Sequence, residues 1–232
     1  MHFSRQSSSD AETRLIGESL GRILRAGDVV YLDGPLGAGK TTLIRSVAAG
    51  LGLHSAAVAS PTFVLIHDYP QPPGAPADRP DLIHIDAYRL RGPEDLDSLG
   101  WDTVVERLAP AAAAPSPHPH RSAALAIEWA ERLGPGLFPG PARITIDHVD
   151  EHTREFSFDL PDDWSLRPGF AALHNRGPAT CPITGLSVPP DSPTYPFANE
   201  RARMADLYRW FSGGYSVSRD ATQADFDEPP PR

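Results

Sequence analysis

The sequence predicts a three-layer α/β domain with a mostly parallel sheet, followed by a small irregular C-terminal segment. Up to about residue 160, short apolar runs typical of buried strands alternate with segments whose apolar residues recur at helical spacing. Beyond that point the alternation stops, and residues 161–232 contain 11 of the 26 prolines. Because proline interrupts helix interiors and central strands, we expect no second sheet-sized core there.

Composition and charge narrow the possible classes of protein. The 232 residues include one cysteine, Cys181, so no disulfide can form within the chain. The net charge of −9 argues against electrostatic binding of nucleic acid over a broad surface. The first residues, MHFSRQSSSD, lack the apolar core of a secretory signal, and no apolar run approaches the roughly 18 residues of a membrane span. These features predict a cytoplasmic protein without membrane contact.

The N-terminal part predicts a helix, a strand and a second helix in that order. Residues 9–25 carry apolar side chains along one helical face. Residues 28–32 form a short apolar run that predicts a buried strand. After a glycine-rich turn, the apolar pattern from Leu43 onward predicts a helix that ends near Gly50 or Gly52.

The rest of the domain continues the alternation. Five further strands are expected, at 63–66, 82–85, 124–127, 144–149 and 155–160, the last two as an antiparallel pair. Pro93 opens a predicted helix that continues to Leu108. The low-complexity stretch at 109–122 is expected to be a disordered insertion.

The loop between the first strand and the second helix reads GPLGAGKTT. Gly34, Gly39, Lys40 and Thr41 occupy the fixed positions of the phosphate-binding motif G-x-x-x-x-G-K-T. The glycines allow backbone N–H groups to face phosphate oxygens, and the next helix presents its positive N-terminal end. Lys40 is expected to reach the β- and γ-phosphates, and the Thr41 hydroxyl to complete a Mg2+ shell. The motif therefore predicts nucleotide binding by a P-loop domain.

Polar residues near this loop are candidates for the metal site and for catalysis. Glu128 and Asp86 each end a predicted strand, and a P-loop needs a carboxylate for Mg2+ at the carboxyl end of a neighbouring strand. Thr62, in the sequence Ser-Pro-Thr-Phe, is a candidate sensor of the γ-phosphate and metal. Which of Asp86 and Thr62 orders the attacking water stays open. The guanine-reading sequence Asn-Lys-x-Asp is absent, which disfavours a GTPase.

Four motifs, GPLGAGKTTL, SPTFVLIHDY, HIDAYRL followed by LDSLGWD, and AIEWAERL, occur in this order between residues 9 and 160. In order and spacing they resemble the family of tRNA threonylcarbamoyladenosine biosynthesis protein TsaE. The resemblance implies a small bacterial ATPase that uses ATP and Mg2+ and is slow when isolated. It further implies action with the TsaB–TsaD pair, which installs threonylcarbamoyl on an adenosine next to the tRNA anticodon, so that tRNA is met only through the complex.

The resemblance also assigns roles to individual residues. It implies that ATP is bound by Thr13, Gly37, Ala38, Gly39, Lys40, Thr41, Thr42 and Trp129. It implies Mg2+ ligation by Thr41 and Glu128, and turnover that depends on Lys40, Thr62, Asp86 and Glu128. The chain departs from the family pattern at Pro35, where an acid is usual, and at Ala87, where leucine is common.

The C-terminal part carries a second resemblance, to the small zinc protein YacG, a DNA gyrase inhibitor. The four cysteine ligands of that family correspond here to Cys181, Thr184, Ala198 and Ala202. One thiolate cannot build a tetrahedral structural zinc site. We therefore expect no zinc, and the loss of ligands argues against contact of this segment with gyrase.

These patterns predict four regions. They are a TsaE-like P-loop ATPase domain at 1–162, a linker at 163–178, a degenerate YacG-like module at 179–218 and a disordered tail at 219–232. Beyond residue 161 only 204–211 shows a helical pattern.

The leading functional hypothesis is an Mg2+-dependent ATPase that supports tRNA modification. Two alternatives stay open: a P-loop small-molecule kinase, and a nucleotide-dependent binding module that acts through its C-terminal segment. His84, which lies between Ile83 and Ile85, is expected on the opposite face of the sheet from them and receives no chemical role.

Overall fold

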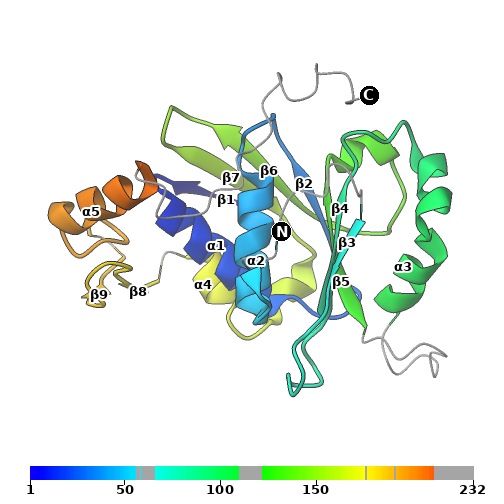
Figure 1. Cartoon of the computed structure of the whole chain (residues 1–232), viewed down its shortest axis with the longest axis horizontal. Helices are drawn as coiled ribbons and strands as arrows, with labels where there is room; N and C mark the ends of the chain where they lie inside the picture. Colours follow the sequence, from blue (N-terminus) through cyan, green and yellow to red (C-terminus); the bar gives the residue numbers. More distant parts are fainter. Residues whose placement is uncertain (56–57, 59–65, 110–121, 176, 191, 212–232) are drawn as a thin grey trace, which may run out of the picture.

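The computed structural model describes residues 1–55, 58, 66–109, 122–175, 177–190 and 192–211. Thr62, the predicted strand residues 63–65, nearly all of the predicted insertion and the tail from residue 212 lie outside these ranges. Within them, the chain forms one large mixed sheet with helices on both faces and a small C-terminal hairpin (Figure 1). The three-layer α/β class is confirmed.

The large sheet contains seven strands in the described residues. Their spatial order is β1 (His2–Ser7), β7 (Arg154–Asp159), β6 (Ala142–His148), β2 (Val29–Asp33), β5 (Ala123–Glu128), β4 (Asp81–Asp86) and β3 (Ile66–Tyr69). The central β6, β2, β5 and β4 run parallel, whereas β1, β7 and β3 pair antiparallel at the two sides. The carboxyl ends of the parallel strands thus meet at one edge, where ligands bind to sheets of this kind.

Helices cover both faces of this sheet (Figure 1). α1 (Asp10–Ile23) and α2 (Lys40–Leu51) lie on one face. The 3-10 helix η2 (Pro93–Leu99), α3 (Trp101–Leu108) and the 3-10 helix η3 (Ala130–Leu133) lie on the other. Each face has its own apolar cluster, because successive side chains of a strand point to opposite sides.

The segment from Pro93 to Leu108 is not the single helix that the sequence predicts. It is divided at Gly100, whose φ of 77° lies in the left-handed region that glycine adopts at little cost. The division lets both pieces contribute to the same core, with Leu96 from η2 and Val104 from α3 buried against the sheet.

α1 and α2 pack with their backbones in close approach. A Cβ added at Gly17 would lie 2.4 Å from the Cβ of Ser46, and one at Gly21 would lie 2.1 Å from the carbonyl oxygen of Val47. Gly21 follows Gly17 in α1, and Val47, which it meets, follows Ser46 in α2, so the two helices run parallel. Thr13, one turn before Gly17, therefore lies at the same end of the pair as the glycine-rich loop.

β1 is a strand that the sequence analysis did not predict. Phe3 is the one apolar side chain within it, so no alternation of apolar residues marks it. The strand pairs along the whole of β7, and Phe3 stacks on Phe158 with ring centroids 4.7 Å apart. Its polar side chains suit an edge position, where one flank meets solvent.

The stretch at 163–178, assigned to a linker, contains regular structure in its described residues. The 3-10 helix η4 (Asp162–Leu166) and α4 (Phe170–His174) lie there, so the expectation of helix only at 204–211 is wrong. Trp164 and Leu173 are 2% and 0% exposed and belong to the apolar cluster beneath α1. Both helices, η4 and α4, are too short for a helical pattern to stand out in the sequence.

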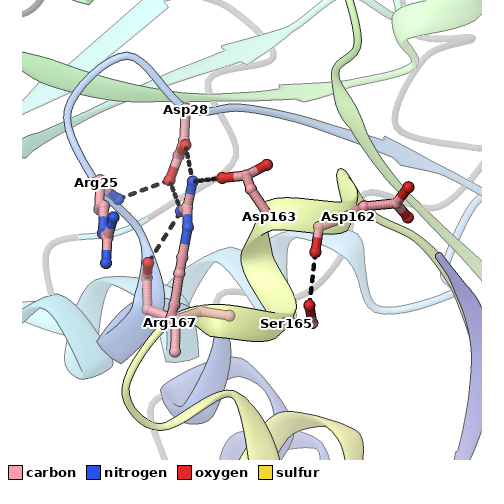
Figure 2. A network of polar contacts seen from close by, with 7 residues as sticks. Arg25, Asp28, Asp162, Asp163, Ser165 and Arg167 are labelled. Carbon is pink, nitrogen blue, oxygen red and sulfur yellow. Dashed lines mark hydrogen bonds and ion pairs between the residues drawn. The ribbon is translucent and has the colours of Figure 1, made fainter.

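Arg167 fastens this segment to the turn between α1 and β2 (Figure 2). Its guanidinium donates to both carboxylate oxygens of Asp28 and to the Ile23 carbonyl near the end of α1. Asp28 also accepts a hydrogen bond of 2.7 Å from the backbone N–H of Arg25 (Figure 2). Because this two-point pairing of arginine with carboxylate is largely buried, it fixes the geometry of the segment.

The C-terminal segment forms a small unit against the N-terminal half of α1. It consists of β8 (Ala179–Thr180), β9 (Ser187–Val188) and α5 (Glu200–Phe211), and its core includes Cys181 and Ala11 of α1. No helix in the described part of the chain combines the length and the apolarity that a membrane crossing requires.

The positions that match zinc ligands lie together in this unit. Burial raises the pKa of the Cys181 thiol, but hydrogen bonds from Thr184 and from the backbone of Ala198 outweigh it and leave the pKa below its ordinary value. Ala202 is 2% exposed in the same apolar cluster. The expectation that no zinc binds here stays a prediction.

Candidate nucleotide site

A glycine-rich loop joins β2 to α2 at the carboxyl edge of the sheet. Gly37 and Gly39 have φ angles of 75° and 102°, which favour glycine, and a Cβ at either would meet no atom within 4 Å. At Gly34, a Cβ would lie 2.3 Å from the carbonyl oxygen of Ile146 in β6. The loop therefore needs glycine for its backbone conformation at one end and for close packing at the other.

Lys40 begins α2 and folds back over this loop. Its ammonium group donates to the carbonyl oxygens of Gly34 at 2.8 Å and Pro35 at 2.9 Å. The same group lies 3.8 Å from the ring centroid of Trp129, a residue held at a φ of 59° directly after β5. The Lys40 residue is 4% exposed, and its positive charge is held at the mouth of the loop.

The two predicted metal ligands are in direct contact. Thr41, in the first turn of α2, donates its hydroxyl to Oε1 of Glu128 at 2.8 Å. Glu128 is the last residue of β5 and is 3% exposed. The structure therefore brings a hydroxyl and a carboxylate from distant parts of the sequence to one point beside the loop.

Asp86 occupies the equivalent position on the neighbouring strand. It ends β4, pairs in register with Glu128 across the parallel ladder and is 4% exposed. Its Oδ1 accepts the backbone N–H of Tyr88 at 3.0 Å, which fixes the turn after the strand. Two carboxylates thus lie at adjacent strand ends, as the sequence predicts.

Thr13 lies in the first turn of α1, at the loop end of the helix pair. Ser9 caps this turn by accepting the backbone N–H of Glu12 at 3.2 Å. The Thr13 hydroxyl lies 2.7 Å from the hydroxyl of Ser7, with which it shares a buried hydrogen bond. The position of Thr13 is compatible with a nucleotide contact, which stays a prediction.

Of three further residues predicted for the site, the structure describes Ala38 and Thr42 but not Thr62. Ala38 is 2% exposed, and its N–H donates to the carbonyl of Pro35 at 3.2 Å. Thr42 lies in the first turn of α2 and is half-buried. Thr62 lies outside the described residues, so its role is untested.

An unusual carboxyl precedes the loop. The pKa of Asp33 is raised to about 6, chiefly by burial and then by the hydrogen bond and the charge of Glu131, whereas Arg143 and Lys40 oppose the shift. Arg143 Nη1 lies 3.4 Å from Asp33 Oδ2. The Asp33 side chain therefore changes charge near neutral pH, close to the Lys40 ammonium.

Sequence reasoning missed one residue that contacts this site. His84 lies on the opposite face of β4 from Ile83 and Ile85, as expected, but its Nε2 atom is 2.9 Å from Glu128 Oε1. The available signal was its spacing of two from Asp86, which places both side chains on one face of the strand.

The donor set suits a hard cation bound together with a nucleotide. Among the described residues, no group of three or more His, Cys, Asp or Glu side chains is placed to hold a metal on its own. Mg2+ in nucleotide sites typically takes one or two protein oxygens and completes its shell with phosphate and water. The Thr41 hydroxyl and the Glu128 carboxylate fit that role, and the open loop fits a phosphate chain.

The loop, its lysine and the strand-end carboxylate place this chain among the P-loop nucleotide-binding proteins. The sequence model of the family described as threonylcarbamoyl adenosine biosynthesis protein TsaE matches residues 7–156, and the chain belongs to this family.

Individual proteins similar to this chain carry the name of the same family. A tRNA threonylcarbamoyladenosine biosynthesis protein TsaE of Streptomyces coelicolor is 51% identical over 137 residues, which cover 59% of this chain and 79% of the relative. Its namesake in Treponema pallidum is 31% identical over 65% of this chain and 96% of its own. The crystal structure of Bacillus subtilis YdiB superposes with a TM-score of 0.50 at 24% identity, covering 72% of this chain and 90% of that one, and shares the fold.

Proposed function

We propose that this chain is an Mg2+-dependent ATPase that supports threonylcarbamoyladenosine modification of tRNA together with TsaB- and TsaD-type proteins in the cytoplasm. Membership of the TsaE family supports the place in tRNA modification. The observation that carries the ATPase part is the 2.8 Å contact between Thr41 and Glu128 beside the glycine-rich loop.

Binding and charge neutralisation account for most of the proposed chemistry. The N–H groups of the loop and the Lys40 ammonium hold the triphosphate, so Lys40 exchanges its carbonyl partners for phosphate oxygens. Thr41 and Glu128 hold Mg2+, which when bound supplies positive charge to the phosphate oxygens.

The attacking water needs an acceptor next to the triphosphate. Asp86 meets the positional requirement, since it is a buried carboxylate at the strand end beside Glu128. Thr62 is the other candidate, and substitution of each residue in turn shows which of the two orients the water. Asp86→Asn should reduce turnover without weakening ATP binding if Asp86 orients the water.

Release of inorganic phosphate tests the proposal. We expect slow Mg2+-dependent release by the isolated chain and faster release when TsaB- and TsaD-type proteins are added. Glu128→Ala should keep nucleotide affinity within about tenfold but lose metal-dependent turnover, whereas the exposed Glu151→Ala should behave as wild type. Full turnover by Glu128→Ala would remove Glu128 from the metal site, and phosphate transfer to a small acceptor would favour a kinase.

A further inference from the structure

A buried histidine contacts the carboxylate proposed to hold the metal. His84 is 0% exposed, and its Nε2 atom lies 2.9 Å from Oε1 of Glu128. It projects from β4 onto the sheet face that α2 covers, together with Leu82 on the same strand. None of the steps proposed above uses this side chain.

The direction of this hydrogen bond follows from the chemistry of the partners. An ionised carboxylate can only accept, so Nε2 of His84 carries the proton and donates. Thr41 donates to the same oxygen at 2.8 Å. Oε1 of Glu128 is therefore held by two donors, and no described residue donates to Oε2.

The surroundings of His84 favour one tautomer of its ring. The Tyr69 ring of the neighbouring strand β3 lies against His84, with centroids 6.5 Å apart and a tilt of 31°. Nδ1 of His84 is buried and has no hydrogen-bond partner among the described residues. A proton on that nitrogen would be a buried donor without an acceptor, so the Nε2–H tautomer is favoured.

We propose that His84 is a positioning residue for Mg2+ ligation by Glu128. Its Nε2–H holds one carboxylate oxygen, which fixes the rotation of the Glu128 side chain and leaves Oε2 for the ion. A hydrogen bond to a ligating carboxylate from a surrounding residue raises the affinity of such a site by reducing its freedom. This inference rests on the proposed function, because it requires that Glu128 binds the metal.

Calorimetric titration with a non-hydrolysable ATP analogue, with Mg2+ and with EDTA, separates metal-coupled from metal-free binding. Wild type should bind the analogue more tightly with Mg2+. His84→Leu should lose about tenfold of this metal-dependent gain while metal-free affinity changes by no more than about twofold. His84→Gln, whose amide can donate in place of Nε2–H, should restore most of the gain, and the exposed His148→Leu should match wild type.

The possible outcomes distinguish the two proposals. A folded His84→Leu protein with the full metal-dependent gain would overturn the role of His84. Failure of the wild-type chain to bind the analogue, or equal binding with and without Mg2+, would instead overturn the proposed function.

A measurement on the wild-type chain covers the case in which His84→Leu does not fold. Long-range proton–nitrogen NMR spectra should show a histidine with a protonated Nε2 whose signal is missing in His84→Gln. This signal should move more on addition of the analogue with Mg2+ than with EDTA. A proton on Nδ1, or a signal that ignores Mg2+, would contradict the proposal.

Discussion

Lys40 is the only lysine of the chain, and its ammonium group is buried between two loop carbonyls and the Trp129 ring. Lys40→Ala removes the side-chain cation that the motif assigns to the β- and γ-phosphates. We expect at least about a hundredfold loss of ATP affinity, measured by calorimetry, because a charge-assisted contact to phosphate is lost.

The single lysine provides an independent readout. Besides the N-terminal amine, only Lys40 can react with an amine-acylating reagent, so peptide mass spectrometry reports on it alone. ATP should slow its modification in the wild-type chain. Equal modification with and without saturating ATP would mean that the nucleotide lies elsewhere.

Asp33 makes folding stability depend on pH in an unusual direction. Its pKa in the folded chain is about 6, above the ordinary value of 3.8, mainly because of burial. The folded chain therefore binds the proton more tightly than the unfolded chain, and this contribution is full below pH 3.8 and lost as the pH rises through about 6. Asp33→Asn removes this dependence of stability on pH. The free energy of unfolding of the variant, relative to that of wild type, should therefore rise by about 1 kcal/mol between pH 4 and pH 7 after allowance for solvent screening.

Asp150 supplies a control of opposite sign. Hydrogen bonds from the backbone of His152 and from Thr153 lower the pKa of this exposed carboxyl. Its contribution to folding stability is present above the pKa of the unfolded chain and is lost as the pH falls through the pKa of the folded chain. Asp150→Asn should therefore become less stable relative to wild type as the pH rises. Urea unfolding at several pH values checks both variants, and parallel profiles for Asp33→Asn and wild type would contradict the assignment.

At the scale of the elements, the contact between α1 and α2 depends on residues without side chains. A Cβ at Gly21 would lie 2.1 Å from a backbone oxygen of α2, so Gly21→Ala must push the helices apart. We expect a loss of about 2–4 kcal/mol in the free energy of unfolding by urea. Gly177→Ala, where a Cβ meets nothing within 4 Å, should change it by less than about 0.5 kcal/mol, and equal effects would contradict the packing.

The elements around the loop could be predicted because each carries a strong local signal. The strand before the loop is apolar up to Leu32, and Glu128 and Asp86 end strands that are rich in apolar residues. Local pattern also gives helix starts such as that of α1, where Ser9 caps the first turn.

Other elements could not be predicted because tertiary contacts define them. β1 exists through its pairing with β7, and η4 and α4 through Trp164, Leu173 and the pairing of Arg167 with Asp28. The contact of His84 with Glu128 needs the register of two strands that are 44 residues apart at this point. A sequence pattern specifies the face of a strand but not which side chains on neighbouring strands touch.

At the scale of the whole molecule, the stretch that follows β7 is part of the main body, whereas the C-terminal unit packs on its surface. A chain that ends at residue 160 lacks Trp164 and Leu173 from the core and leaves Asp28 without Arg167. It should lose at least about 5 kcal/mol or fail to fold.

A chain that ends at residue 175 provides the matched comparison. It loses the apolar contact of the C-terminal unit with Ala11 and Leu15 of α1, which corresponds to about 1–2 kcal/mol. Urea unfolding and ATP titration of the two truncated chains measure the difference. Equal stability of both truncations would show that residues 161–175 are dispensable for the fold.

The proposed function requires that the Thr41 hydroxyl of α2 and the Glu128 carboxylate of β5 share one cation beside the glycine-rich loop. Crystals of the full chain grown with Mn2+ and a non-hydrolysable ATP analogue test it directly, because anomalous scattering locates the ion. We expect the triphosphate on the loop and the ion in contact with Thr41 Oγ1, with Glu128 bound to it directly or through one water. An ion that touches neither residue, or a nucleotide bound away from Lys40, would contradict it.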